Sequence, residues 1–318
     1  IPMKSHVNLC LALLTGASLI SSAYSGTLNW IGGPGNWDTS TPNWSGGLWS
    51  TGNTAVFGGA AGNVSVVGTI PGVDGLTFNT TGYALTGTGT LTLTAPTISL
   101  GSGITVTDSG ALFGGTTGLT ITGGGTFVMT KTGHPLTGTY QIDSGSKLVV
   151  GGNIFSAAGN DAIVNGTVDF AGSLSTRWIN HLTGNGLITA DSLAAAGTVN
   201  LRVNSGDFAG TIQDGPDGRK IAFIFQPTNN QCGTFRLSGN NTYSEQTLVR
   251  NGATLRLDSP GSLSPNSWLR FETAYTNTVE LAAFSVAGTN FRSAGGINFA
   301  GTGGSPSPRF VAIGADRS

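Results

Sequence analysis

Short strand-like units recur along this chain, each with apolar residues at both ends and usually a polar residue between them. Examples are Leu91-Thr92-Leu93, Ile98-Ser99-Leu100, Ile104-Thr105-Val106, Leu119-Thr120-Ile121 and Phe127-Val128-Met129. Because successive side chains of a strand point to opposite faces, the two outer residues of each unit share one face. Glycine and Asp-Ser-Gly segments between the units predict tight turns. The pattern therefore predicts an all-β chain of very short strands.

The spacing of these units predicts how they assemble. They begin at residues 91, 98, 104, 112, 119 and 127. Three such steps sum to about 21 residues, near the lower end of the range for solenoid repeats. One coil cannot bury its inward residues alone, whereas stacked coils share one apolar interior. We predict a parallel β-solenoid with three-sided coils of about 21 residues. A β-sandwich is the alternative, since short alternating strands also build sandwiches.

Two longer segments resemble each other. Residues 125–150 read GTFVMTKTGHPLTGTYQIDSGSKLVV, and residues 233–257 read GTFRLSGNNTYSEQTLVRNGATLRL. Both begin with Gly-Thr-Phe, have a glycine in their last turn (Gly145 and Gly252) and end in an apolar strand. Self-similarity on this scale is typical of stacked-repeat proteins.

The second copy, extended to residues 233–263, resembles the autotransporter-associated β-strand repeat, whose pattern runs GTLTLSG-NTYSGGTTV-GGTL. It departs from that pattern at Glu245-Gln246, where the family usually has Gly-Gly. The segment over residues 26–60, which is rich in tryptophan, and the later GLTFNTTGYALTGTGTLTLT are together similar to the N-terminal region of bacterial exported proteins with these repeats. The resemblance implies a right-handed parallel β-helix at the cell surface, a passenger, stalk or adhesin-like module. It implies no catalytic residues and no cofactor.

The N-terminus has the form of an export signal. A basic start at Met3-Lys4 precedes an apolar stretch, and Ala23-Tyr24-Ser25 supplies small residues before Gly26. A membrane anchor is the alternative, but the apolar stretch is shorter than the ~20 residues that span a bilayer. We expect a signal peptide over residues 1–25 and a secreted or outer-surface protein. The β-helix is expected over residues 61–318, truncated at the C-terminus because no barrel-like strands or apolar tail follow.

Residues 26–60 differ from the rest of the chain because they hold four of its six tryptophans: Trp30, Trp37, Trp44 and Trp49. A solenoid end exposes unpaired strand edges, and large aromatic side chains can close the core there. Indole faces also stack on sugar rings. We therefore predict a Trp-rich cap over residues 26–60 and keep the four tryptophans as candidate glycan-binding residues.

Charged residues are scarce, at 9% of the chain against about 25% in a usual protein. No Lys or Arg occurs between Lys4 and Lys131, so nucleic acid is not an expected partner. Cleavage before Gly26 would leave Cys232 as the single cysteine, which rules out an internal disulfide. We expect no metal site and no membrane-spanning segment in the mature chain.

The sequence lacks the motifs of a serine hydrolase, a dinucleotide-binding enzyme, a phosphate-binding loop and a zinc protease. His134 and His181 are both expected to be exposed. Polysaccharide-cleaving sites need clustered carboxylates, and the nearest approach is Asp207, Asp214 and Asp217. We interpret the DGPDGRK segment, which ends at Arg219-Lys220, as a charged turn.

Two functions follow from these observations. The first is a non-catalytic β-helical surface protein, structural or adhesive, whose partner is a host or neighbouring cell surface. The alternative is a β-helical protein that binds or degrades extracellular polysaccharide.

Overall fold

The apolar–polar–apolar units form the sides of coils in the computed structural model. One coil consists of β7 (Thr90–Leu93), β8 (Thr97–Leu100) and β9 (Thr105–Asp108). The next repeats the order with β10 (Leu112–Gly114), β11 (Leu119–Thr122) and β12 (Thr126–Met129). Along β7 and β8 the leucine and isoleucine side chains are buried and the residue between them is partly exposed. The strands predicted at Leu91, Ile98, Leu119 and Phe127 are therefore confirmed. The third strand begins one residue later than predicted, at Thr105, and buries Val106 and Asp108.

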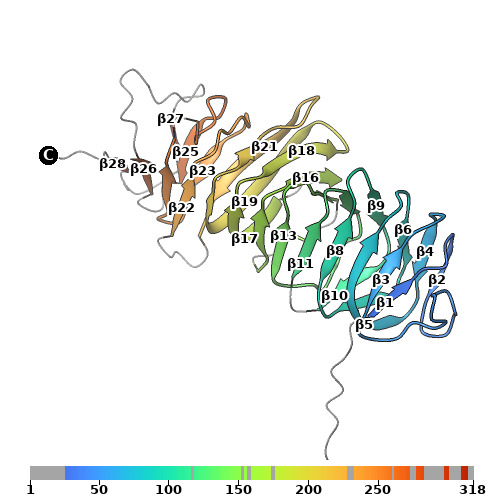
Figure 1. Ribbon diagram of the computed structural model, residues 1–318. Helices are drawn as coiled ribbons and strands as arrows, with labels where there is room; N and C mark the ends of the chain where they lie inside the picture. Colours follow the sequence, from blue (N-terminus) through green and yellow to red (C-terminus); the bar gives the residue numbers. More distant parts are fainter. Residues whose placement is uncertain are drawn as a thin grey trace, which may run out of the picture.

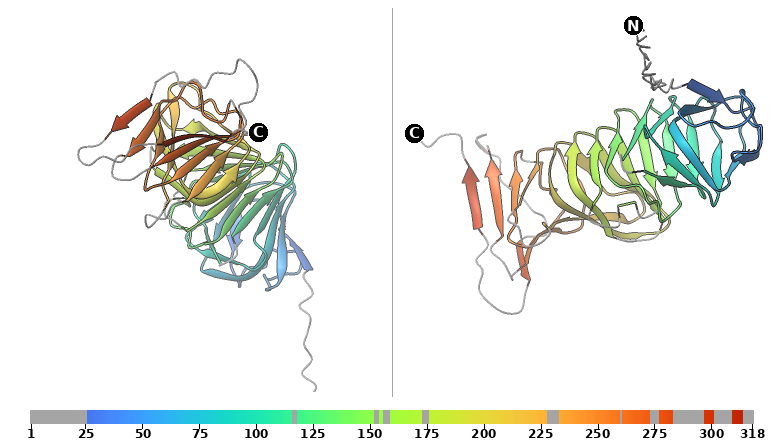
Figure 2. Two further views of the ribbon diagram at one scale, coloured as in Figure 1. Left: turned by 90° about the vertical axis from the view of Figure 1, so that its left-hand side faces the viewer. Right: turned by 90° about the horizontal axis from the view of Figure 1, so that it is seen from below.

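Each strand pairs in parallel with a strand of the neighbouring coil. Leu112 lies beside Thr90, 22 residues earlier, and Lys147 lies beside Thr126, 21 residues earlier. About 9 turns of roughly 22 residues stack into an elongated rod (Figures 1 and 2). The parallel β-solenoid is therefore confirmed, while its right-handedness stays a prediction.

The structure describes residues 26–115, 118–151, 154–155, 159–172, 176–227, 233–259, 261–272, 277–282, 297–300 and 309–313. Every regular element in these ranges is a strand. The expected signal peptide, residues 1–25, and Cys232 lie outside them.

Strand pairing defines three sides of the coil, numbered in the order of β7, β8 and β9. The first side also holds β10, β21 (Arg219–Phe225), β23 (Thr247–Val249), β25 (Leu269–Glu272) and β27 (Ile297–Ala300). The second side holds β1 (Gly26–Asn29), β3 (Asn53–Phe57), β8, β11, β13 (Thr139–Ile142), β15 (Asp161–Val164), β22 (Thr234–Leu237), β24 (Thr254–Leu257), β26 (Thr278–Ala282) and β28 (Arg309–Ile313). The third side holds β2 (Gly35–Trp37), β4 (Asn63–Val66), β6 (Ala84–Gly87), β9, β12, β14 (Lys147–Val150), β16 (Thr167–Gly172), β18 (Leu187–Leu193) and β20 (Thr211–Ile212).

Three long strands bend around the corner between the first and second sides. They are β5 (Thr69–Phe78), β17 (Thr176–Gly184) and β19 (Gly197–Phe208), and each pairs on both sides. The first and second sides therefore form one 19-stranded sheet, and the third side forms a 9-stranded sheet. Between the sheets, one continuous core runs from Trp30 to Val279.

Each of the two similar sequence segments forms one complete coil. In the first copy β12 pairs with β14, and Phe127 lies beside Leu148. In the second, β22 pairs with β24, and Phe235 lies beside Leu255. The copies start on different sides, the third for β12 and the second for β22. The shared motif therefore specifies a turn of the solenoid without fixing the side on which it begins.

The segment after β2 covers the outer edges of the first strands. Asn29 of β1 accepts a hydrogen bond from the amide of Ser45 at 2.8 Å, and the amide of Ile31 donates to the carbonyl of Asn43 at 3.0 Å. The side chain of Asn43 also donates to the carbonyl of Asn36 in β2 at 2.8 Å. Polar groups that a bare strand edge would leave unpaired are satisfied here within the chain.

Candidate functional site

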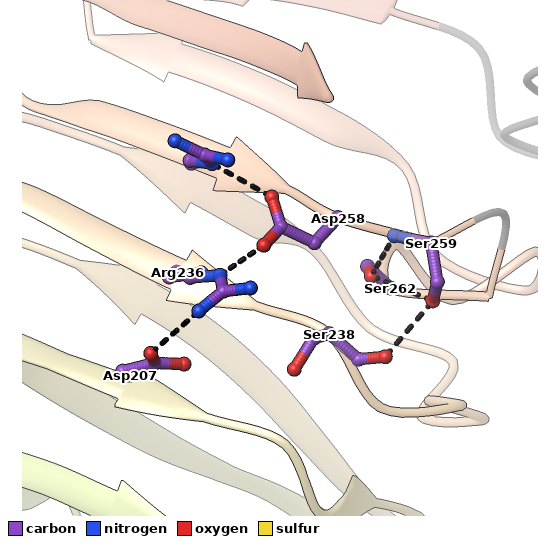
Figure 3. A network of polar contacts seen from close by, with 7 residues as sticks. Asp207, Arg236, Ser238, Asp258, Ser259 and Ser262 are labelled. Carbon is purple, nitrogen blue, oxygen red and sulfur yellow. Dashed lines mark hydrogen bonds and ion pairs between the residues drawn. The ribbon is translucent and has the colours of Figure 1, made fainter. Parts of the chain in front are cut away.

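A ladder of charges lies on the water-facing surface of the second side (Figure 3). Strand register places Asp207 of β19 beside Arg236 of β22, and Arg236 beside Arg256 of β24. The Arg236 guanidinium donates to Asp207 through Nη1 at 3.0 Å and to Asp258 through Nε. Arg256 Nε donates to the other oxygen of Asp258 at 2.7 Å. Neighbouring coils are thus joined by side-chain pairs of opposite charge.

These contacts hold both kinds of group in their charged forms. Burial alone would raise the pKa of Asp258, but hydrogen bonds from Arg256 and Arg236 outweigh burial and lower the pKa below its ordinary value. Hydrogen bonds to Asp258 and Asp207 raise the pKa of Arg236. Exposed ion pairs contribute at most about 1 kcal/mol each, so the ladder arranges charge on the surface more than it stabilises the fold.

An open recess of about 550 Å³ adjoins this ladder. Its lining comes from the second side and from the turns that follow it: Asn165, Thr183, Gly184, Asn185, Asp207, Ala209, Arg236 and Ser238. The lining offers amide and hydroxyl groups, and its one carboxylate, Asp207, is bonded to Arg236. A general acid or base needs a group free to exchange a proton with substrate. The recess therefore presents amide and hydroxyl groups together with a carboxylate that is paired with Arg236.

Sequence reasoning missed this ladder, although a signal for it was present. Arg236 and Arg256 are the middle residues of the units FRL and LRL, so both were expected to face water. Their partners were not foreseeable, because the coil between Gly206 and Phe235 is 29 residues long and the one between Thr234 and Thr254 only 20.

The three aspartates grouped in the sequence serve separate contacts. Asp207 belongs to the ladder, whereas Asp214 accepts the amides of Ile221 at 2.8 Å and Ser244 at 3.0 Å. Asp217 has a positive φ of 56° at the tip of the turn. In the described ranges no three His, Cys, Asp or Glu side chains gather as metal ligands would. The DGPDGRK segment is a turn whose first aspartate bonds two backbone amides.

The expectation that His134 is exposed was wrong. Its side chain is fully buried, with the ring 5.4 Å from that of Phe113 and Nε2 3.4 Å from the buried carboxylate of Asp108. The amide of Phe113, which faces away from β7, donates to His134 Nδ1 at 3.1 Å. In a regular coil a carbonyl of the next strand would accept the hydrogen bond from this amide. The described loop after β12 has no strand there, and the imidazole of His134 accepts the bond instead. His181, by contrast, is exposed as expected and bonds Ser205.

Burial dominates the electrostatics of this pair. Desolvation raises the pKa of Asp108 to about 7 and lowers the pKa of His134 to about 4. Because Nδ1 of His134 accepts a hydrogen bond, the neutral ring carries its proton on Nε2, which faces Asp108. Both side chains are fully buried, so we assign the pair a structural role.

The four N-terminal tryptophans are all buried. Trp37 is fully buried, and its ring centroid lies 5.0 Å from that of Trp44 and 5.1 Å from that of Trp49. Trp30 meets Trp44 edge to face at 5.1 Å. A sugar ring stacks on an exposed indole face, and this packing leaves none open. The cluster closes the core at the N-terminal end of the rod, and glycan binding by these residues stays a prediction.

The most recognisable residues of the second repeat copy are also structural. Asn241 is buried, accepts the amide of Ile212 at 2.7 Å and donates to the carbonyl of Ser262 at 2.7 Å, which links three successive coils. Tyr243 is buried, and its hydroxyl bonds Thr247 at 2.6 Å. The Asn-Thr-Tyr part of the motif therefore joins coils and leaves recognition to other positions.

Comparison with known proteins gives one informative match. Over an alignment of 298 residues, the chain is 29% identical to the Adhesin BmaC autotransporter of Brucella suis biovar 1 (strain 1330). This chain is a distant homologue of an autotransporter adhesin. The alignment covers 78% of this chain and 8% of that protein, so the chain spans a small part of the relative's length.

No family model matches the chain, and no solved structure matches it. The β-solenoid is consistent with the passenger domain of such an adhesin. Among the described residues, no helix is both long and apolar enough to cross a membrane.

Proposed function

We propose that this chain is an exported, non-catalytic β-solenoid module that contributes to adhesion at the bacterial surface. The observation that carries the proposal is its homology to an autotransporter adhesin along a fold of stacked coils. A rod of parallel coils holds binding surfaces at a fixed distance from their attachment point, which suits a passenger or stalk. The host or neighbouring cell surface is the proposed partner.

Three segments make up the proposed module. A signal peptide over residues 1–25 directs export, the Trp-rich segment over residues 26–60 caps the rod, and residues 61–318 form the β-helix, with which strands β2 and β3 of the cap pair in parallel, while β1 pairs with β3. The edge contacts of Asn43 and Ser45 support the cap. If the full chain is expressed in a Gram-negative host, the exported product should begin at Gly26, which N-terminal sequencing would reveal. A periplasmic product that begins at Met3 would contradict the signal peptide.

Adhesion is tested with the exported chain coupled to fluorescent beads. We expect these beads to bind cultured epithelial cells severalfold better than beads coated with heat-unfolded chain at equal density. Soluble folded chain should compete, because specific binding sites saturate. Equal binding by folded and unfolded chain, or binding that soluble chain does not reduce, would exclude a specific adhesive role.

A further inference from the structure

The two tryptophans outside the N-terminal cluster lie on one face of the rod. Trp178 is in β17, and Trp268 immediately precedes β25. Both are partly exposed, unlike the four buried tryptophans near the N-terminus. The strands β17, β19, β21, β23 and β25 follow one another along the first side (Figure 1), so the two indoles stand at the two ends of this series of strands.

Register aligns side chains of the first side in rows. Trp178 lies beside Arg202, Arg202 beside Ile224, Ile224 beside Leu248, and Leu248 beside Arg270. Ile224 and Leu248 are buried, whereas Trp178, Arg202 and Arg270 are partly exposed. Amides and one more arginine flank this row. We call the whole set the Trp/Arg face; its other members are Asn200, Asn204, Gln226, Gln246, Arg250 and Trp268.

The arginines of this face differ from those of the ladder on the second side. Among the described residues, no ion pair joins Arg202 or Arg270 to a carboxylate. Instead the Arg202 guanidinium lies 5.4 Å from the ring centroid of Trp178, and Arg270 donates to the amide oxygen of Gln246 at 3.3 Å. Arg250 likewise donates to Gln226 at 3.0 Å. Neutral partners leave the positive charges of Arg202 and Arg270 uncompensated.

Two of these charges also affect each other. Desolvation lowers the pKa of Arg202, and the positive charge of Arg250 lowers it further. A bound anion beside Arg202 would offset this unfavourable interaction. The outward side chains of β17, β19, β21 and β23 on this side include no carboxylate. Asp161, bonded by Asn180 at 2.8 Å, lies at its corner, and Glu272 ends β25.

We infer that the Trp/Arg face binds an extended acidic polysaccharide. Guanidinium groups pair with carboxylates in a planar, two-bonded geometry, side-chain amides bond hydroxyl groups, and indoles stack on sugar rings. Coils repeat every ~4.8 Å, which spaces these groups along the rod so that a linear chain can contact several of them. This site is distinct from the recess on the second side, and the inference does not depend on the adhesive role.

The residues that depart from the repeat pattern contribute to this face. Where the autotransporter-associated repeat usually has Gly-Gly, this chain has Glu245-Gln246. Glu245 forms an ion pair with Lys220 at 3.0 Å, and Gln246 holds Arg270. The departure therefore replaces two residues without side chains by two that organise charge on the surface.

The test measures binding of the exported chain to polygalacturonate and to its fully methyl-esterified form. The two polymers share a backbone and differ in charge. We expect saturable binding to the acid form, weaker binding as salt rises, and at least a tenfold lower affinity for the ester. Arg202→Gln and Arg270→Gln should each weaken binding on the order of tenfold, because each loses a charge-assisted contact.

Arg219→Gln is the matched control. It removes the same charge at a corner of the solenoid, where Arg219 donates to the carbonyl of Asp191 at 3.2 Å, and should leave the affinity unchanged. Circular dichroism and melting temperature show whether each variant keeps the fold, and Arg202→Lys should retain part of the affinity if the fold is intact. Equal binding to acid and ester, or equal losses in all glutamine variants, would overturn the inference.

Two further ligands separate a polysaccharide site from a general anion-binding surface. Single-stranded DNA and anionic phospholipid vesicles should bind more weakly than polygalacturonate at equal ionic strength, and stronger binding by either would refute the assignment. If the glutamine variants lose polysaccharide binding while coated beads still bind cells, this inference holds and the adhesive role rests on another surface. If beads fail to bind cells but polygalacturonate binds, only the adhesive proposal fails.

Discussion

At the scale of single residues, the most unusual position in the core is occupied by Asp108 and His134. Asp108 ends β9 with an inward side chain, in register with Leu85 and Met129, where the core is otherwise apolar. A buried carboxylate is costly unless it is paired or protonated. The Nε2–Oδ2 distance of 3.4 Å is too long for a strong hydrogen bond between the two side chains. Burial is therefore the main cause that shifts the pKa values of both groups in favour of their neutral forms.

The pair predicts a specific dependence of stability on pH. In the folded protein the pKa of Asp108 is raised to about 7, so this group favours folding at low pH and less so as pH rises from about 4 to about 7. The pKa of His134 is lowered to about 4, so this group favours folding above about pH 6.5 and less so as pH falls towards about 4. The two slopes oppose each other, because folding moves one proton from imidazole to carboxyl.

Single substitutions should therefore expose slopes that the native pair cancels. Asp108→Asn should make the free energy of unfolding rise between about pH 4.5 and pH 6.5, and His134→Gln should make it fall, each by on the order of 2 kcal/mol. Urea unfolding of the native chain and both variants at the two pH values measures this. Parallel pH profiles for all three proteins would show that the two groups do not titrate within the core.

At the scale of the coil, buried polar side chains connect turns that the strands alone do not connect. The third side has no described strand after β20, and Asn241 supplies the links there instead, to Ile212 in one direction and Ser262 in the other. Both hydrogen bonds are buried, so loss of the Asn241 side chain leaves the backbone amide of Ile212 and the carbonyl of Ser262 without these partners.

Asn241→Ala should destabilise the protein by about 2–4 kcal/mol, since each buried group left unpaired costs about 1–3 kcal/mol. The adjacent Asn240→Ala is the control, because Asn240 is exposed and its replacement should change stability by less than about 0.5 kcal/mol. Urea unfolding followed by circular dichroism compares the two. Equal effects of both substitutions would mean that the neighbouring coils do not depend on Asn241.

The coil is also the scale at which sequence reasoning succeeded and failed. Strands such as β7 and β8 could be predicted, since alternation of apolar and polar residues has one physical cause: burial of alternate side chains. His134 could not be placed, because its burial depends on a strand missing from the first side of the neighbouring coil. The Trp/Arg face could not be predicted either. The lengths of the coils vary, and these lengths determine which side chains lie next to each other on neighbouring strands. The periodic part of the fold could therefore be predicted from the sequence, whereas the surface contacts between coils could not.

At the scale of the whole molecule, the ends of the rod decide whether it remains a single particle. A parallel solenoid offers unpaired strand edges at each end, and edges of this kind add strands from other chains. At the N-terminal end, Trp44 anchors the covering segment: it is buried and packs 5.1 Å from Trp30, 5.0 Å from Trp37 and 5.6 Å from Phe57. The neighbouring Ser45 bonds the edge of β1.

Trp44→Ala should release this segment and make the rod self-associate. Removal of a buried tryptophan costs about 3–5 kcal/mol, which is enough to open a terminal coil while the remaining coils stay folded. Size-exclusion chromatography with light scattering should show mass increasing with protein concentration, and hydrogen exchange should accelerate first in β1 and β2. Trp268→Ala, which replaces a partly exposed tryptophan far from the N-terminal edge, should remain monomeric at the same concentrations. A Trp44→Ala variant that stays monomeric although β1 exchanges rapidly would show that covering this edge is not what prevents association.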